Sequence, residues 1–175
     1  MGRLAEFAEL VARPVLPLDR TLAVLGAVVR PDQDPDAVVA GLDELAAACT
    51  SDDPTALCAE LFGPGGLGPA GADYYDPASS VLGEVLQRRR GIPISLAVVA
   101  LEVGRRRGVG LRAIGMPGHF LLRSADDVDR FLDPYDGGRA CTRSDCRAVF
   151  EALHPGGVPF LEEYLEPVPD RAVVA

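Results

Sequence analysis

The sequence predicts an α+β fold in which helices come first and a small antiparallel sheet follows. Residues 1–62 carry apolar residues at helical spacing, interrupted by proline-containing start signals. Residues 92–103 are almost entirely apolar, which is typical of a helix buried on nearly all sides. Residues 111–133 contain short apolar runs bounded by glycine, proline and aspartate, which is typical of strands. Helices followed by such strands indicate the α+β class.

Length and charge limit the classes of function. A chain of 175 residues with 48% hydrophobic residues suggests one compact unit with a substantial core. We divide it into an N-terminal helical subdomain, 1–62, and a core, 63–175, that begins with a Gly- and Pro-rich loop at 63–72. The net charge of −9 argues against general binding to nucleic acid or membranes. All 17 basic residues are arginine, a composition typical of bacterial genes with high GC content.

No signal for export, membrane insertion or a metal centre is found in the sequence. Met1 to Arg13 includes acidic residues and is interpreted as an amphipathic helix, and no apolar run reaches transmembrane length. Four cysteines without a CxxC pair, together with only two histidines, argue against a zinc site. We therefore expect reduced thiols, a cytoplasmic location, and no metal or other cofactor.

Four helices are predicted in the N-terminal subdomain. Asp34-Pro35 and Asp53-Pro54 each combine a capping aspartate with a proline in the first turn, so each predicts a helix start. Asp19 is expected to cap the second helix. The inward residues expected in the first two helices are Leu4, Phe7, Ala8 and Val11, then Leu22, Leu25, Val28 and Val29.

Two further helices precede the predicted sheet. Asp76-Pro77 predicts the start of one, which is expected to end at Gly91 after three arginines. The second is the central helix: Pro93 suits its first turn, and Gly108 suits the left-handed position after its end. The N-terminus of this helix gathers free N–H groups and the positive end of the dipole, so chemistry is expected there.

Three short strands and a helix are expected after the central helix. The strands are predicted at 111–115, 119–123 and 129–133, and an amphipathic helix at 142–153. If the hairpin loop is centred on Asp126, then His119 and Asp133 are direct cross-strand neighbours about 5 Å apart at Cβ. The carboxylate would then orient the imidazole, as in a catalytic triad. The alternative is a purely structural hydrogen-bonded pair, and a one-residue slip would separate the two side chains.

The start of the central helix offers no cysteine as a nucleophile. Ser95 is the only nucleophilic side chain in the first turn, and its alternative role is to satisfy free N–H groups at the helix start. Tyr74, Tyr75 and Asp76 follow the Gly-rich loop and either form the polar wall of a cleft or serve as aromatic anchors and a cap.

Three motifs carry a family resemblance. YYDPASSVLGEVLQRRRGIPISL starts at Tyr74, PGHFLLR starts at Pro117, and FLDPYDGG ends at Gly138. In this order they resemble the SirB1-type proteins, a branch of the transglutaminase-like superfamily, over about 73–138. Ser79 departs from the pattern, which generally has asparagine there.

The resemblance implies a papain-like core, in which a helix that carries the nucleophile packs on a sheet that carries histidine and aspartate. His119 and Asp133 match those two positions, but Pro93 stands where active relatives have cysteine. The resemblance therefore implies a transglutaminase fold without its nucleophile. SirB1-type proteins also carry a helical-repeat tail, and 164–175 resembles the entry to it.

Two main functions are expected. The first is a non-catalytic binding or regulatory module for a protein or peptide-like ligand, and its cleft would be lined by Tyr74, Tyr75, Asp76, Arg90, Pro93, Ser95, His119 and Asp133. The second is a hydrolase or acyltransferase acting on amide or ester bonds, with Ser95 as nucleophile, His119 as base and Asp133 as orienting group. A third possibility is binding of partner helices through an exposed apolar patch on 1–62.

Overall fold

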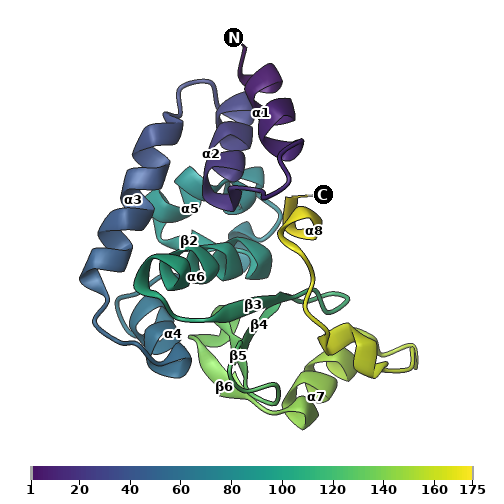
Figure 1. The fold of residues 1–175 in the computed structure, drawn as a ribbon. Helices are drawn as coiled ribbons and strands as arrows, with labels where there is room; N and C mark the ends of the chain where they lie inside the picture. Colours follow the sequence, from purple (N-terminus) through teal and green to yellow (C-terminus); the bar gives the residue numbers. More distant parts are fainter. Residues whose placement is uncertain (1, 175) are drawn as a thin grey trace.

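A computed structural model describes residues 2–174, in which a cluster of helices lies on one side of a central helix and a small sheet on the other (Figure 1). The first four helices are α1 (Arg3–Val11), α2 (Leu18–Val29), α3 (Pro35–Ala48) and α4 (Pro54–Phe62). Asp34 accepts a hydrogen bond from the N–H of Asp36, and Asp53 accepts from two N–H groups of the first turn of α4. Both predicted caps are therefore confirmed.

The inward faces predicted for α1 and α2 are partly wrong. Leu10 is the buried residue of α1, whereas Leu4 is 68% exposed. Asp19 does not cap α2, because the helix begins at Leu18 and Asp19 lies within its first turn, where its carboxylate pairs with Arg106 at 2.7 Å. α2 packs against both α1 and α3, so its small residues turn inward. The buried residues of α2 are Leu18, Thr21, Ala23, Val24, Gly26 and Ala27.

The helix predicted after Asp76 starts later and ends earlier than expected. Asp76 caps a 3-10 turn, η2 (Pro77–Ser80), and α5 (Leu82–Arg88) begins beyond it. Arg89, with φ of 55°, ends α5 in place of Gly91. Gly91 instead belongs to β2 (Arg90–Gly91), which pairs in parallel with β1 (Gly68–Pro69). A Cβ on Gly91 would lie 2.5 Å from Ser95 Oγ, so this close approach needs glycine.

The central helix α6 (Pro93–Arg107) is buried as predicted. Every residue from Leu96 to Gly104 is buried, and Gly108 ends the helix with φ of 75°. α2, α3, α4 and α5 contact it, and so do strands β3 and β4. Near its C-terminal end, Arg106 forms ion pairs with Asp19 of α2, Asp43 of α3 and Glu102 of α6.

The sheet has the strand order β3-β4-β5-β6, and each neighbouring pair is antiparallel. Its strands are β3 (Leu111–Ile114), β4 (Leu121–Ser124), β5 (Phe131–Asp133) and β6 (Arg139–Cys141), of which β6 was not predicted. Leu122 faces Leu132, so the hairpin is centred on Asp127 and not on Asp126 as predicted. The N–H of Ser124 donates to the carbonyl of Arg130 at 3.0 Å, as expected for a hairpin centred on Asp127. His119 lies just before β4, outside the ladder.

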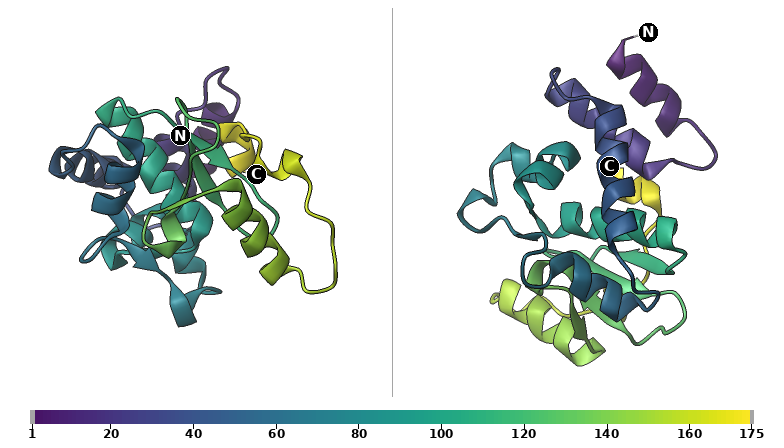
Figure 2. Two further views of the ribbon diagram at one scale, coloured as in Figure 1. Left: turned by 90° about the horizontal axis from the view of Figure 1, so that it is seen from below. Right: turned by 90° about the vertical axis from the view of Figure 1, so that its left-hand side faces the viewer.

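The last helices cover the remaining face of the sheet and then return to the N-terminal helices. α7 (Arg143–Leu153) is capped by Thr142, and its Phe150 packs with Ile114, Leu121 and Phe131. Figure 2 (right) shows α7 and α6 on opposite sides of the sheet. Beyond η4 (Glu162–Leu165), α8 (Asp170–Val174) packs on α2. Within residues 2–174, no helix has the length and apolar character needed to cross a membrane.

Candidate functional site

The predicted contact between His119 and Asp133 is present. His119 follows a turn that its own N–H closes to the carbonyl of Met116, and Asp133 is the last residue of β5. His119 Nε2 lies 2.8 Å from Asp133 Oδ2, with the two side chains 10% and 5% exposed. The two residues are not direct cross-strand neighbours as predicted, because the register differs by two residues and His119 lies in the turn before β4.

Asp133 is held as a hydrogen-bond acceptor. Its Oδ1 accepts from the N–H groups of Tyr135 at 2.9 Å and Asp136 at 3.2 Å, so Asp133 caps the 3-10 turn η3 (Pro134–Asp136). An ionised carboxylate has only acceptors, so Nε2 of His119 carries the proton of their shared hydrogen bond. Nδ1 is then the ring nitrogen that can serve a ligand, as an acceptor in the neutral imidazole.

A cavity of about 570 Å³ opens beside this pair. Three tyrosines contribute to it: the ring centroids of Tyr74 and Tyr75 are 5.2 Å apart, and those of Tyr74 and Tyr135 are 6.2 Å apart. Tyr75 is 93% exposed and stands at the rim. The full lining is Tyr74, Tyr75, Pro93, Gly118, His119, Asp133, Tyr135, Asp136, Arg139, Val149 and Leu153.

The start of α6 brings Pro93, not Ser95, into this cavity. Pro93 is the first residue of the helix and lines the cavity together with His119. Ser95 is 5% exposed, and its hydroxyl lies 2.8 Å from the carbonyl oxygen of Ser79 and 3.0 Å from that of Ile92. It also accepts from the N–H of Ile92 at 3.0 Å. The geometry of Ser95 therefore matches its alternative role, in which the hydroxyl forms hydrogen bonds with backbone groups at the start of α6.

Comparison with known proteins identifies the superfamily to which the chain belongs. Residues 33–175 match a family model described as transglutaminase-like superfamily. The chain belongs to the transglutaminase-like superfamily. No solved structure matches this transglutaminase-like chain.

Relatives of this transglutaminase-like chain occur in bacteria and in animals. A UPF0162 protein of Xylella fastidiosa is 42% identical over 106 residues, which cover 58% of this chain and 38% of the relative. A UPF0162 protein of Pseudomonas aeruginosa is 49% identical over 77 residues, covering 44% of this chain and 28% of the relative. F-box only protein 21 of the mouse is 34% identical over 83 residues, covering 42% of this chain and 13% of the relative. The chain thus spans well under half the length of these relatives.

Two other residues expected in the transglutaminase-like cleft lie elsewhere. Asp76 accepts from the N–H of Ala78 at 3.0 Å and pairs with Arg88 at 2.9 Å, and these hydrogen bonds lower the pKa of its carboxyl. Arg90 has an exposed side chain on β2, outside the set of residues that line the cavity. Tyr135 and Arg139, by contrast, line the cavity but were not predicted, although Tyr135 stands two residues after Asp133 in the DPYDGG motif.

The four cysteines of this transglutaminase-like chain are buried, and burial makes their thiols weak nucleophiles. Burial is the main cause that raises the pKa of Cys141 to about 11, and those of Cys58 and Cys146 to about 12. Thiols with such pKa values are poor nucleophiles at neutral pH. In the described part of the chain, no three side chains of the types His, Cys, Asp and Glu are arranged so that they could hold a metal ion.

Proposed function

We propose that this chain is a transglutaminase-like domain without a nucleophile, which binds a protein or peptide-like ligand in the cavity around His119. The position of Pro93 carries the proposal: it occupies the first turn of α6 and lines the same cavity as the His119–Asp133 pair. Among residues 2–174, those that line this cavity include no cysteine, serine or threonine. Such a site can position a ligand but has no side chain of the usual kind to attack it.

The lining suits a peptide. Tyr74, Tyr75 and Tyr135 offer flat apolar faces with polar tips, and Val149 and Leu153 add an aliphatic wall. Nδ1 of His119 can accept a hydrogen bond from an amide N–H in this setting. An apolar cavity with a few convergent polar groups is the usual form of a ligand site.

We also propose that the chain belongs to the SirB1-type branch and works in the cytoplasm. The motif from Tyr74 to Leu96 and the similarity to UPF0162 proteins support the first statement. The second is supported by four cysteines that are all free and buried, as expected where thiols stay reduced. The alternative, a hydrolase or acyltransferase with Ser95 as nucleophile, requires that Ser95 leave its hydrogen bonds to Ser79 and Ile92.

Peptide selection tests the binding role. Peptides selected from a phage-displayed random library on the wild-type chain are measured by fluorescence anisotropy. His119→Ala and Tyr135→Ala should each weaken binding by about tenfold or more, as expected for residues at the centre of an interface. Arg3→Ala, on the distant helix α1, serves as the control. Failure to select any peptide, or equal binding by all variants, would contradict the proposal.

A fluorophosphonate probe tests the absence of catalysis. Because the hydroxyl of Ser95 is buried and bonded to the backbone, the wild-type chain should not be labelled. Labelling that disappears in Ser95→Ala would establish the serine-dependent enzyme instead.

A further inference from the structure

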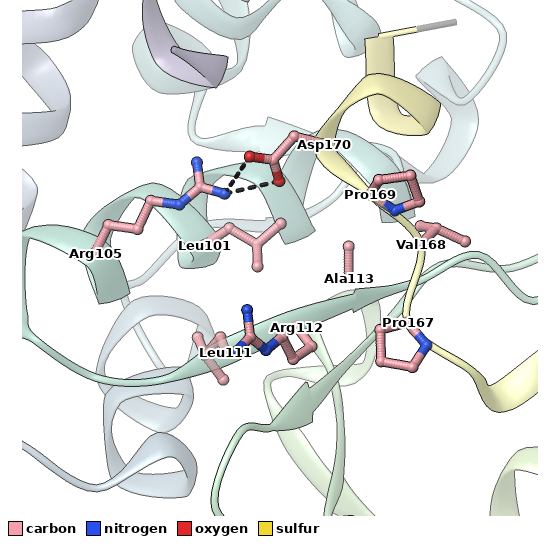
Figure 3. A pocket seen from close by; sticks show the side chains of 9 residues that line it. All are labelled: Leu101, Arg105, Leu111, Arg112, Ala113, Pro167, Val168, Pro169 and Asp170. Carbon is pink, nitrogen blue, oxygen red and sulfur yellow. Dashed lines mark hydrogen bonds and ion pairs between the residues drawn. The ribbon is translucent and has the colours of Figure 1, made fainter. Parts of the chain in front are cut away.

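A second cavity shares no lining residue with the cavity at His119. It has a volume of about 500 Å³ and opens between the C-terminal half of α6, strand β3, and the segment 167–170 (Figure 3). We call it the edge slot; it is lined by Leu101, Arg105, Leu111, Arg112, Ala113, Pro167, Val168, Pro169 and Asp170.

The slot exposes the outer edge of the sheet. β3 is the first strand in the order β3-β4-β5-β6, and the N–H of Ala125 donates to the carbonyl of Gly110 at 2.9 Å. Backbone groups alternate in direction along a strand, so Gly110 and Arg112 face β4, while Leu111 and Ala113 turn their N–H and C=O groups outward. Of the outward N–H and C=O groups of Leu111 and Ala113, only the Ala113 carbonyl has a backbone partner among residues 2–174. This partner is the N–H of Val168, at 2.9 Å.

The C-terminal segment begins to cover this edge and then leaves it. Pro167 forms an isolated antiparallel bridge with Ile114, but Pro169 has no N–H with which to continue a ladder. Both carboxylate oxygens of Asp170 then lie 2.7 Å from an Arg105 nitrogen, which ties the segment to α6 on the far side of the slot (Figure 3). Because the segment is fixed on both sides, the opening over Leu111 is built into the fold.

The charges around the slot favour an acidic occupant. Arg112 is directly opposite Arg123 in the ladder, so the two side chains share one face of the sheet. Arg123 has only Glu166 as an ion-pair partner, at 3.8 Å, and Arg112 has none among the residues that the structure describes. Arg105, in contrast, is already paired with Glu102 and Asp170.

We propose that the edge slot binds a short extended peptide segment of a partner protein, which pairs with the outer edge of β3 and places an acidic side chain beside Arg112. Side chains of adjacent strands align in facing pairs. The residue opposite Leu111 then points toward the apolar floor at Leu101, and its neighbour points toward Arg112 on the other face. The segment therefore alternates apolar and acidic residues, and its main chain supplies the donors and acceptors that the edge lacks.

A labelled pentapeptide tests this proposal. The probe is acetylated serine–valine–glutamate–valine–serine with a fluorescein label, compared with a version in which lysine replaces glutamate and a version N-methylated at both valines. In anisotropy titrations only the first peptide should bind the wild-type chain. Arg112→Glu should weaken its binding by about tenfold or more and permit binding of the lysine peptide. Arg90→Glu, which alters an exposed arginine on β2 outside the lining of both cavities, should change neither affinity.

Amide hydrogen exchange provides the second readout. The N–H group of Leu111 should become protected when the glutamate peptide binds, because it gains a partner, whereas the position opposite Ala113 is already occupied by Val168. The proposal is overturned if the glutamate peptide does not bind, if N-methylation leaves binding intact, or if both arginine variants behave alike. It is also overturned if sedimentation shows that the free chain already dimerises and that Arg112→Glu abolishes the dimer, since the edge would then belong to a second copy. None of these outcomes depends on the His119 cavity.

Discussion

Asp133 lies almost fully buried and uses Oδ2 to hold Nε2 of His119 at 2.8 Å, while its Oδ1 accepts two backbone N–H groups. One carboxylate thus fixes both the imidazole and the turn after β5. The orientation of His119 and the shape of the cavity wall at Tyr135 depend on the same side chain.

Asp133→Ala should lower the free energy of unfolding by about 3 kcal/mol, because three hydrogen bonds to a buried carboxylate are lost and their donors stay unpaired. Asp133→Asn retains an acceptor for the two N–H groups and should cost only about 1 kcal/mol. Urea denaturation measures both, with the exposed Asp126→Asn as the control. Equal stabilities for Asp133→Ala and Asp126→Asn would show that the network is unimportant.

Ser95→Ala should destabilise the chain without affecting ligand binding at the His119 cavity. The hydroxyl of Ser95 is buried and bridges Ser79 to the start of α6, so its removal should cost about 1–3 kcal/mol. Thermal denaturation measures this cost, and the exposed Ser80→Ala should have almost no effect. If Ser95→Ala instead abolished peptide binding at full stability, a direct role in the site would have to be considered.

Pro93→Cys should create a reactive thiol at the start of α6. The helix N-terminus and a nearby histidine both favour the thiolate, so iodoacetamide should alkylate this site at about pH 6 at least about tenfold faster than free cysteine. The double variant Pro93→Cys with His119→Ala is the control and should lose the acceleration. The native thiols give little background, since burial raises the pKa of Cys58, Cys141 and Cys146 to about 11–12. Identical rates in the single and double variants would argue that His119 does not reach position 93.

Glu60 should make stability depend on pH in acid. Its carboxylate accepts from the hydroxyl of Ser51 and from the N–H and hydroxyl of Thr50, which lowers its pKa from 4.5 to about 2. The unfolded chain therefore binds more protons between these two values, so this contribution is complete above about pH 5 and is lost as the pH falls toward about 2. The melting temperature of the wild-type chain should consequently fall more steeply over this range than that of Glu60→Gln.

The matched control for this effect is Glu44→Gln, which alters an exposed glutamate on α3. It should follow the wild-type curve. Parallel curves for the wild-type chain and Glu60→Gln would refute the assigned role of Thr50 and Ser51.

Local signals made much of the fold predictable. Asp34-Pro35, Asp53-Pro54 and the bounds of α6 at Pro93 and Gly108 depend on neighbouring residues only, and the structure confirms them. The sequence predicts an inward face of α2 made of large apolar residues, and this prediction is partly wrong. Close helix packing instead selects small residues such as Ala23 and Ala27.

The site was less predictable, because it depends on contacts between distant segments. The His119–Asp133 contact could be predicted since both residues lie at the same end of the β4–β5 hairpin, although the predicted register was wrong by two residues. The choice between two roles for Ser95 depends on the carbonyl of Ser79, which only the folded chain brings near. Tyr135 enters the cavity through the turn that Asp133 caps, which no spacing rule reveals.

The proline codon at position 93 also determines how many nucleotide changes are needed to place a nucleophile at the start of α6. A single nucleotide substitution converts a proline codon into a serine or threonine codon, whereas a cysteine codon needs more than one. Because Pro93 lines the cavity beside His119, the shortest mutational step at this codon would place a hydroxyl next to the imidazole. Laboratory lineages selected for ester cleavage should therefore acquire serine or threonine at this codon before they acquire cysteine.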